Sequence, residues 1–138
     1  MRYLGIDYGT KKIGTSLSDE SGMLAFPHTT IENNERLIDA IKKIITEYKV
    51  EAIVVGDPKT ISGADNPLVE DVSIFIMRLE KEFGTPIHKE GEAFSSFEAA
   101  RFAPKGKNHE HSAAAAIILQ RFLDMHRSGE NTPVSDTM

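Results

Sequence analysis

The chain has 138 residues, of which 40% are hydrophobic and 27% are charged, and it contains no cysteine. These proportions are typical of one globular domain with a sizeable core. The lack of cysteine excludes disulfides and thiolate metal sites, so any metal ion must be bound through oxygen or imidazole. The formal net charge of −5 excludes a surface that is basic overall, so a nucleic acid partner would need a local cationic rim.

The first stretch, LGIDYGTKKIGTSLSD, predicts a β-hairpin with one acid at its inner end. Residues 3–7 and 12–18 alternate in the manner of antiparallel strands, and Asp7 ends the first of them. Met1 leads into this strand without a signal-peptide pattern, and no apolar run approaches the roughly 20 residues of a membrane span. We therefore expect a cytoplasmic protein with no membrane partner.

Three glycines change the interpretation of Asp7. A lone Asp after a strand is usually a turn residue that accepts backbone hydrogen bonds. Gly5, Gly9 and Gly14 remove side chains around this carboxylate, so a phosphate backbone or a hydrated metal ion could approach the main chain there. This pattern favours Asp7 as a candidate site residue.

A third strand, a helix and a buried strand follow the hairpin. Residues 23–31 are typical of a strand, with Pro27 indicating an edge or a bulge. Asn33 or Asn34 is expected to cap a helix whose apolar residues recur with the 3.6-residue period. The apolar, β-branched run EAIVVG at 51–56 is typical of a central parallel strand reached through a crossover helix.

The next segment, DPKTISGADNP at 57–67, is rich in turn-forming residues and too long to be only a connection. It should lie at the carboxyl end of a central strand, beside Asp7, where open α/β sheets bind ligands. A second helix is predicted at 68–83 and a fifth strand at 86–90.

The fifth strand leads into a pair of acids. Glu90 and Glu92 are two residues apart, which places both carboxylates on the same side of an extended chain. A capping box formed by Ser95 and Glu98 predicts a short helix that ends at Phe102.

The last helix is predicted to open with HEHS at 109–112, followed by alanines that permit close packing. The composition turns polar from Ser128 onward. We therefore expect one domain at 1–127 and a disordered tail at 128–138.

Several cations fall in turns and loops next to the candidate site, while the acids concentrate on predicted helix faces. The cations could contact phosphates, although the two in the hairpin could also be ordinary surface residues. These cations are Lys11, Lys12, Lys59, Arg101, Lys105 and Lys107.

Taken together, four segments resemble the YqgF (RuvX) family. They are GIDYGTKKIG at 5–14, VVGDP at 54–58, the strand entering Glu92, and AAAAIILQRFL at 113–123. The family is described as Holliday junction resolvases and pre-16S rRNA nucleases. The resemblance implies an α/β domain of RNase H-like fold, whose five-stranded mixed sheet starts with an antiparallel hairpin, continues with parallel strands and is flanked by helices.

The resemblance also implies a hydrolytic site that depends on divalent metal ions. Two Mg²⁺ or Mn²⁺ ions roughly 4 Å apart can neutralise the transferring phosphoryl group and generate hydroxide near neutral pH, and such ions prefer oxygen ligands. By this resemblance, Asp7 is the ligand shared between the metal ions and Glu92 is a second ligand.

The chain departs from the family pattern at charged positions. Gly91-Glu92-Ala93 stands where the family has Asp-Glu-Arg, and His111 stands where the family has the Asp that opens the last helix. Glu90 or Glu110 could replace a missing acid. Alternatively, His109 or His111 could bind metal or move a proton directly. In the simpler interpretation, these helix-start residues only cap the helix or interact with its dipole.

Three classes of function stay open at this stage. The first is a metal-dependent nuclease on structured nucleic acid, acting on the 5′ end of pre-16S rRNA or, as a second choice, on branched DNA as a junction resolvase. The second is a catalytically inactive relative that binds RNA or a protein. The third is an ATPase, because DYGT at 7–10 also resembles the first phosphate loop of actin and the sugar kinases. Those ATPases bind nucleotide between two lobes, however, and this chain has one. We expect a monomer or a weak homodimer.

Overall fold

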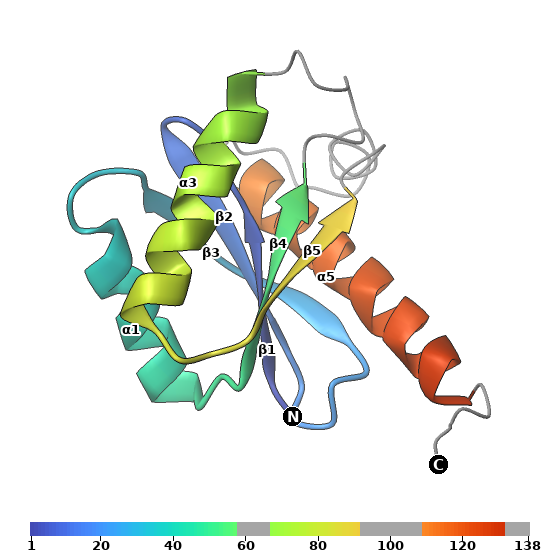
Figure 1. Cartoon of the computed structure of the whole chain (residues 1–138). Coiled ribbons are helices and arrows are strands. Elements are labelled where there is room, and N and C mark those ends of the chain that lie inside the picture. The colour runs from blue at the N-terminus through green and yellow to red at the C-terminus, as the bar shows by residue number, and fades with distance from the viewer. Residues whose placement is uncertain (58–66, 92–108, 132–138) are drawn as a thin grey trace.

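The computed structural model describes residues 1–57, 67–91 and 109–131. They form a five-stranded mixed sheet with the strand order β3-β2-β1-β4-β5 (Figure 1). Its strands are β1 (Tyr3–Asp7), β2 (Lys12–Ser18), β3 (Ala25–Glu32), β4 (Ala52–Asp57) and β5 (Ile87–Gly91). The β1–β2 and β2–β3 pairs are antiparallel, whereas β1–β4 and β4–β5 are parallel. The predicted hairpin start and parallel continuation are confirmed.

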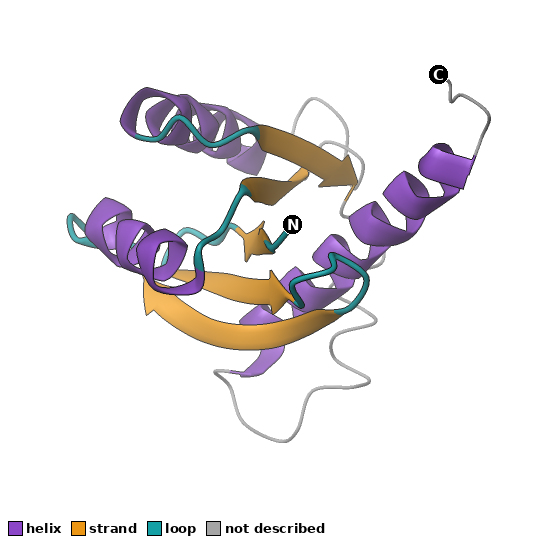
Figure 2. Cartoon of the chain, turned by 90° about the horizontal axis from the view of Figure 1, so that it is seen from below, coloured by secondary structure: helices purple, strands orange, loops and turns teal. Residues whose placement is uncertain are grey.

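Helices cover both faces of the sheet (Figure 2). One face is covered by α1 (Leu37–Tyr48) and α3 (Pro67–Glu82), and the opposite face by α5 (His109–Asn131). The two faces have separate apolar cores because side chains alternate along each strand. Leu4 and Ile6 point into the core under α1 and α3, while Val54 packs against Phe122 of α5. Within the described residues, no helix is long and apolar enough to cross a membrane.

The β3 strand is an edge strand, and it contains the irregularity that Pro27 predicts. The β2–β3 register shifts between Thr15 and Ser16, which pair with Thr29 and Pro27 respectively. The strand begins at Ala25 rather than at residue 23, because the carboxylate of Asp19 accepts the backbone N–H groups of the two preceding residues and holds them in the turn.

The expected cap of the first helix is wrong. The residue at the N-cap is Arg36, and no side chain caps the helix. Instead, the Asn34 side chain accepts the backbone N–H of Arg36 at 2.9 Å, in the turn before the helix. The Asn33 amide points away from the helix and donates to the Gly9 carbonyl at 2.9 Å. The two asparagines therefore shape the approach to the helix and the hairpin turn.

The C-terminal boundary also differs from the expectation. Helix α5 continues through Asn131, so the predicted tail does not begin at Ser128. The remainder of that tail, at 132–138, lies outside the described residues, as does the short helix predicted at 95–102.

Candidate active site

Asp7 lies at the centre of a row of residues that crosses the sheet. Its strand register pairs it with Gly14, and continuing the parallel register by one residue places it beside Gly56. The row consists of Thr30, Gly14, Asp7, Gly56 and Glu90, one residue from each strand. By strand alternation these positions share the face that carries α5. The central carboxylate therefore has a glycine on each side.

His111, in the first turns of α5, lies directly against this carboxylate. Its Nδ1 is 3.7 Å from Oδ2 of Asp7, and the side chains are 37% and 11% exposed, respectively. This separation is longer than a hydrogen bond, so the contact is electrostatic when the imidazole carries a proton. The structure thus brings together two of the four predicted catalytic residues.

Glycine and serine positions in the hairpin hold the start of α5 this close. A Cβ atom on Gly14 would overlap the main-chain carbonyl of His111 and lie 2.8 Å from its Cβ. One turn further on, the Ser16 hydroxyl donates a buried hydrogen bond of 2.8 Å to the Ala115 carbonyl. A larger residue at position 14 would push the helix, and with it the imidazole, away from Asp7.

The hairpin turn beside Asp7 is held on two sides. Besides the side-chain bond to Gly9, the backbone N–H of Asn33 donates to the Lys11 carbonyl at 3.0 Å. On the other side, the Tyr8 ring packs on Phe75 of α3, with centroids 5.0 Å apart. Sequence reasoning missed this positioning role of Asn33, because an asparagine before a helix is an ordinary capping signal.

A hollow of about 570 Å³ opens over the acid and the turn. It is lined by Asp7, Tyr8, Gly9, Thr10, Lys11, Lys12, Leu68 and His111. Lys11 is exposed and Lys12 is half-buried. One carboxylate, one imidazole and two ammonium groups therefore converge on the same space. Anionic phosphate would be attracted to the ammonium groups, while the carboxylate could bind a cation.

The other predicted site residues lie outside the described residues. These are Glu92 and the cations Lys59, Arg101, Lys105 and Lys107, together with the side chains of His109 and Glu110, whose backbone is in the first turn of α5. For these residues the predicted roles stay predictions.

The described residues include one candidate metal ligand, Asp7. Among them, no three His, Asp or Glu side chains are grouped so that they could hold one ion. Asp7 offers a carboxylate, the ligand that Mg²⁺ prefers, and Mg²⁺ commonly keeps several waters beside one or two carboxylates. The donor set therefore suits a largely hydrated ion bound at Asp7.

Glu90 lies on the same face of the sheet as Asp7, two strands away. Burial raises the pKa of the Glu90 carboxyl, and the positive charge of Arg121 on α5 partly opposes that rise. Gly56 lies between the two acids in the row and places no side chain there.

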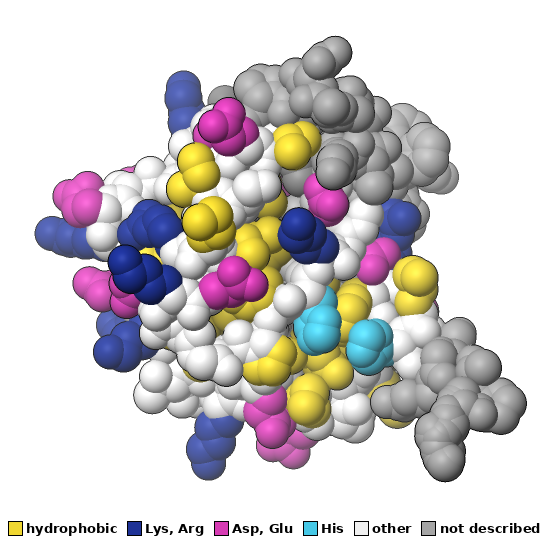
Figure 3. Space-filling view, in the orientation of Figure 1, with side chains coloured by type: hydrophobic (Ala, Val, Ile, Leu, Met, Phe, Trp, Pro, Cys, Tyr) yellow, Lys and Arg dark blue, Asp and Glu magenta, His cyan; other side chains and the backbone are white. Residues whose placement is uncertain are grey.

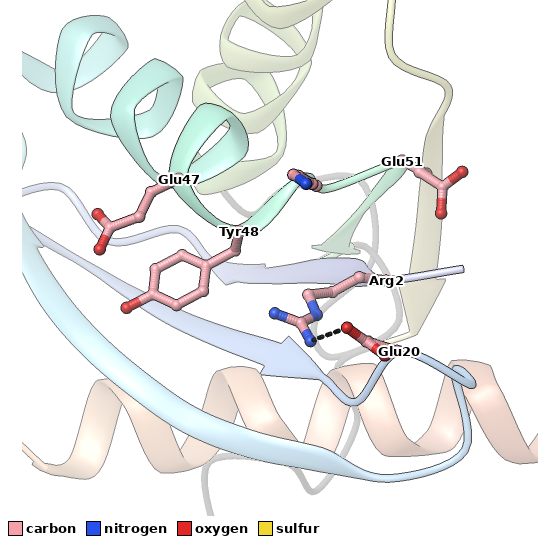
Figure 4. A pocket seen from close by; sticks show the side chains of 6 residues that line it. Arg2, Glu20, Glu47, Tyr48 and Glu51 are labelled. Atoms are coloured by element: carbon pink, nitrogen blue, oxygen red, sulfur yellow. Dashed lines mark ion pairs between the residues drawn. The ribbon is translucent and has the colours of Figure 1, made fainter.

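A second hollow lies at the opposite end of the sheet (Figure 4). It measures about 440 Å³ and is lined by Arg2, Glu20, Glu47, Tyr48, Lys49 and Glu51. Arg2 and Glu20 point toward one another, with Nη2 and Oε2 3.7 Å apart. On the face shown in Figure 3, acidic and basic side chains are likewise intermixed. Acids outnumber cations in this hollow, which makes it a poor place for phosphate.

Comparison with solved structures gives the fold class. The chain resembles Thermus thermophilus RuvC bound to a Holliday junction substrate, with a TM-score of 0.61 and 13% identity over 92% of this chain and 96% of the other. It also resembles the fowlpox virus Holliday junction resolvase, with a TM-score of 0.57 and 11% identity over 91% and 99%. The domain therefore has the RNase H-like fold of the RuvC-like resolvases.

Sequence comparison gives the family. Residues 1–125 match the family described as RuvX, Holliday junction resolvase, and the chain belongs to it. The family and fold are those of phosphodiester hydrolases.

Curated relatives span nearly the same length. A Lactobacillus helveticus protein named "Putative pre-16S rRNA nuclease" is 34% identical over 92% of this chain and 99% of its own length. Relatives of the same name from Thermoanaerobacter pseudethanolicus and a Geobacillus strain are 36% and 38% identical, over 93% and 90% of this chain and 99% and 98% of their own lengths. The predicted family resemblance is confirmed.

Proposed function

We propose that this protein is a nuclease dependent on Mg²⁺ or Mn²⁺ that trims the 5′ end of pre-16S rRNA during ribosome biogenesis. One observation carries the proposal: a mostly buried carboxylate at the centre of the sheet shares a hollow with an imidazole and two lysines. The names of the full-length relatives support the choice of substrate. This substrate requires a cytoplasmic protein.

Each residue of the hollow has a role in this proposal. Asp7 holds the metal ion together with Glu92, and the ion, when bound, supplies charge neutralisation and an activated water. His111 orients the Asp7 carboxylate and can donate a proton to the leaving oxygen, as imidazoles do near neutral pH. Lys11 and Lys12 bind phosphates on either side of the cleaved bond.

The predicted residues beyond the hollow complete the proposal. Glu110 is a further acid at the start of α5, where it would supplement His111. Lys59, Arg101, Lys105 and Lys107 extend the cationic rim along the substrate backbone.

Resolution of Holliday junctions is the second candidate, and it is favoured by the family description and the RuvC-like fold. Cutting two strands in concert requires two sites, hence a dimer of this chain. A monomer or weak dimer that cuts one strand at a time fits rRNA trimming better.

The decisive experiment compares Asp7→Asn with Glu20→Gln on a pre-16S rRNA fragment that carries its 5′ extension. We expect cleavage that needs Mg²⁺ or Mn²⁺, and Asp7→Asn should lower it on the order of 10²- to 10³-fold, because a charge at the reacting centre is lost. Glu20→Gln, an exposed acid at the far end of the sheet, should cleave normally.

Three results would contradict the proposal. Cleavage that survives both chelation and Asp7→Asn would overturn the assigned site. RNA binding without any cleavage would favour an inactive, binding relative. Efficient cutting of a four-way DNA junction in place of the RNA would favour the resolvase.

A further inference from the structure

A third hollow adjoins the candidate active site along the edge strand β3. It measures about 380 Å³ and is lined by Lys12, His28, Thr29, Thr30, Ile31, Glu32 and Ser112. Lys12 also lines the hollow over Asp7, and Ser112 follows His111 in α5. The two hollows therefore meet at Lys12 and the start of the last helix, so one ligand could occupy both.

The charges of this third hollow differ from those over Asp7. Lys12 lies directly opposite Glu32 in the β2–β3 ladder, so its positive charge is offset by a facing carboxylate. The hollow over Asp7 has Lys11 in addition, with no second acid among its lining residues. A phosphate would be attracted to the hollow over Asp7, whereas the β3 hollow is close to neutral.

The polar groups of the β3 hollow suit a sugar and base. Thr30 and Ser112 carry hydroxyls that both donate and accept, Glu32 only accepts, and Lys12 only donates. A ribonucleotide presents the matching groups, and its 2′-hydroxyl both donates and accepts. Glu32 is exposed and Thr30 is half-buried, so both can be reached from solution.

We propose that the β3 hollow binds the ribonucleotide next to the cleaved bond and recognises its 2′-hydroxyl through Glu32 and Thr30. Lys12 bridges this nucleotide and the phosphate over Asp7. This inference rests on the proposed nuclease function and sharpens it, because such a contact selects RNA over DNA. Nothing in the resemblance or in the names of the relatives assigns a role to these β3 residues.

The test uses a set of RNA substrates that differ by a single 2′-deoxy substitution at each nucleotide flanking the cleaved bond. For the wild-type protein, one position should lower kcat/KM roughly tenfold, because losing the hydroxyl leaves its polar partner unpaired. Glu32→Ala and Thr30→Val should each reduce the ratio of kcat/KM for the unsubstituted RNA to kcat/KM for that 2′-deoxy RNA toward one. The matched control is Glu35→Ala, a nearby exposed acid outside the lining of both hollows, and it should keep the full ratio.

Because the two kcat/KM values are compared within one variant, a loss of folded protein lowers both equally and leaves their ratio unchanged. The same series is measured as binding affinity with Asp7→Asn, so turnover is not required. A penalty that is absent at every position, or that persists in both β3 variants, would overturn this inference while leaving Asp7-dependent cleavage intact. A 2′-deoxy penalty in binding without any cleavage would overturn the nuclease proposal and the placement next to a cleaved bond, and would support only the recognition of a 2′-hydroxyl by the β3 hollow.

Discussion

The two ends of the sheet carry hollows of comparable size but opposite character. At the carboxyl end of β1, Asp7 is 11% exposed and shares its hollow with two lysines. At the opposite end, Glu20 and Glu51 are 91% and 59% exposed, and only Glu20 points toward Arg2 (Figure 4). Exposed acids stay hydrated, so an ion pair with them contributes little binding free energy. A mostly buried carboxylate beside cations is instead typical of a functional site. The comparison shows that charge placement, more than hollow size, marks the site.

The two ends also use glycine differently. At the site, Gly14 allows the main chain of α5 to lie against the hairpin. At the far end, Gly22 supplies a left-handed turn with φ of +71°. The first glycine positions a functional side chain, and the second only closes a turn.

After Asp7→Asn, the next largest effect on cleavage is expected from His111→Ala, which removes the imidazole beside Asp7. Losing a proton donor from a reacting site commonly costs on the order of 10²-fold in rate, and we expect a loss of that size in kcat on the RNA substrate. His126→Ala, at an exposed position in the same helix, is the matched control and should cleave normally. Equal activity of the two variants would remove His111 from the site.

The next effect concerns stability. Gly14→Ala should lower the free energy of unfolding by about 1–3 kcal/mol, because its methyl group forces the helix start away from the hairpin. Gly22→Ala should cost about 1–2 kcal/mol, because of its left-handed backbone. Gly84→Ala has no atom within 4 Å of its new methyl group and should be close to neutral. Urea unfolding measures all three.

Activity then distinguishes the two destabilised glycine variants. At a temperature where both are folded, Gly14→Ala should lose cleavage because His111 has moved, whereas Gly22→Ala should retain it. If both cleave like the wild-type protein, close packing at Gly14 serves stability alone.

These glycines also show how far the sequence predicts the molecule. Alternation and turn signals locate the strands to within one or two residues, since those signals are local. The glycine pattern indicates close approach near Asp7 but not that the main chain of His111 is what approaches. That contact joins distant parts of the chain and depends on how α5 packs across the sheet.

The sequence does not predict the role of Asn33 for the same reason. Its partner, Gly9, is 24 residues away, and the two meet only because β3 pairs with β2. The β3 hollow likewise combines residues from β2, β3 and α5, which no single segment reveals. Once the strand register is known, alternation alone places Glu90 on the same face as Asp7, because a period of two is set by the chain itself.

A smaller effect is expected from the two hairpin lysines. The double variant Lys11→Ala/Lys12→Ala should weaken binding to RNA. The slope of the logarithm of the binding constant against the logarithm of salt concentration should become shallower by about 1.4, which corresponds to two lost phosphate contacts on a single strand. The control is Lys42→Ala/Lys43→Ala on α1, which does not line the site. An unchanged salt slope would show that the hairpin lysines do not contact phosphate.

At the far end of the sheet, Lys49→Gly should increase stability. Lys49 ends α1 in a left-handed conformation with φ of 55°, which glycine adopts at lower cost. We expect a gain of up to about 1 kcal/mol in the free energy of unfolding, with RNA binding unchanged. Weaker RNA binding would instead assign this end of the sheet a part in substrate recognition.

The smallest effect is expected at Asp19 and appears only in acid. Hydrogen bonds from the Ser21 hydroxyl and from the backbone N–H groups of Met23 and Leu24 lower the pKa of Asp19 from 3.8 to about 2. Well above the unfolded pKa of 3.8 the carboxylate is ionised in the folded and unfolded chains alike, so its stabilising contribution is complete. As the pH falls toward 2, the unfolded chain takes up the proton first and that contribution is lost.

Asp19→Asn keeps one acceptor oxygen in the turn but cannot titrate. Its free energy of unfolding should therefore fall less than that of the wild-type protein between pH 4.5 and pH 2, when both are measured by urea unfolding. Parallel curves would mean that the turn gains nothing from the charge on Asp19. Because the turn lies at the end of the sheet away from Asp7, cleavage at neutral pH should be the same in both proteins, which separates acid stability from catalysis.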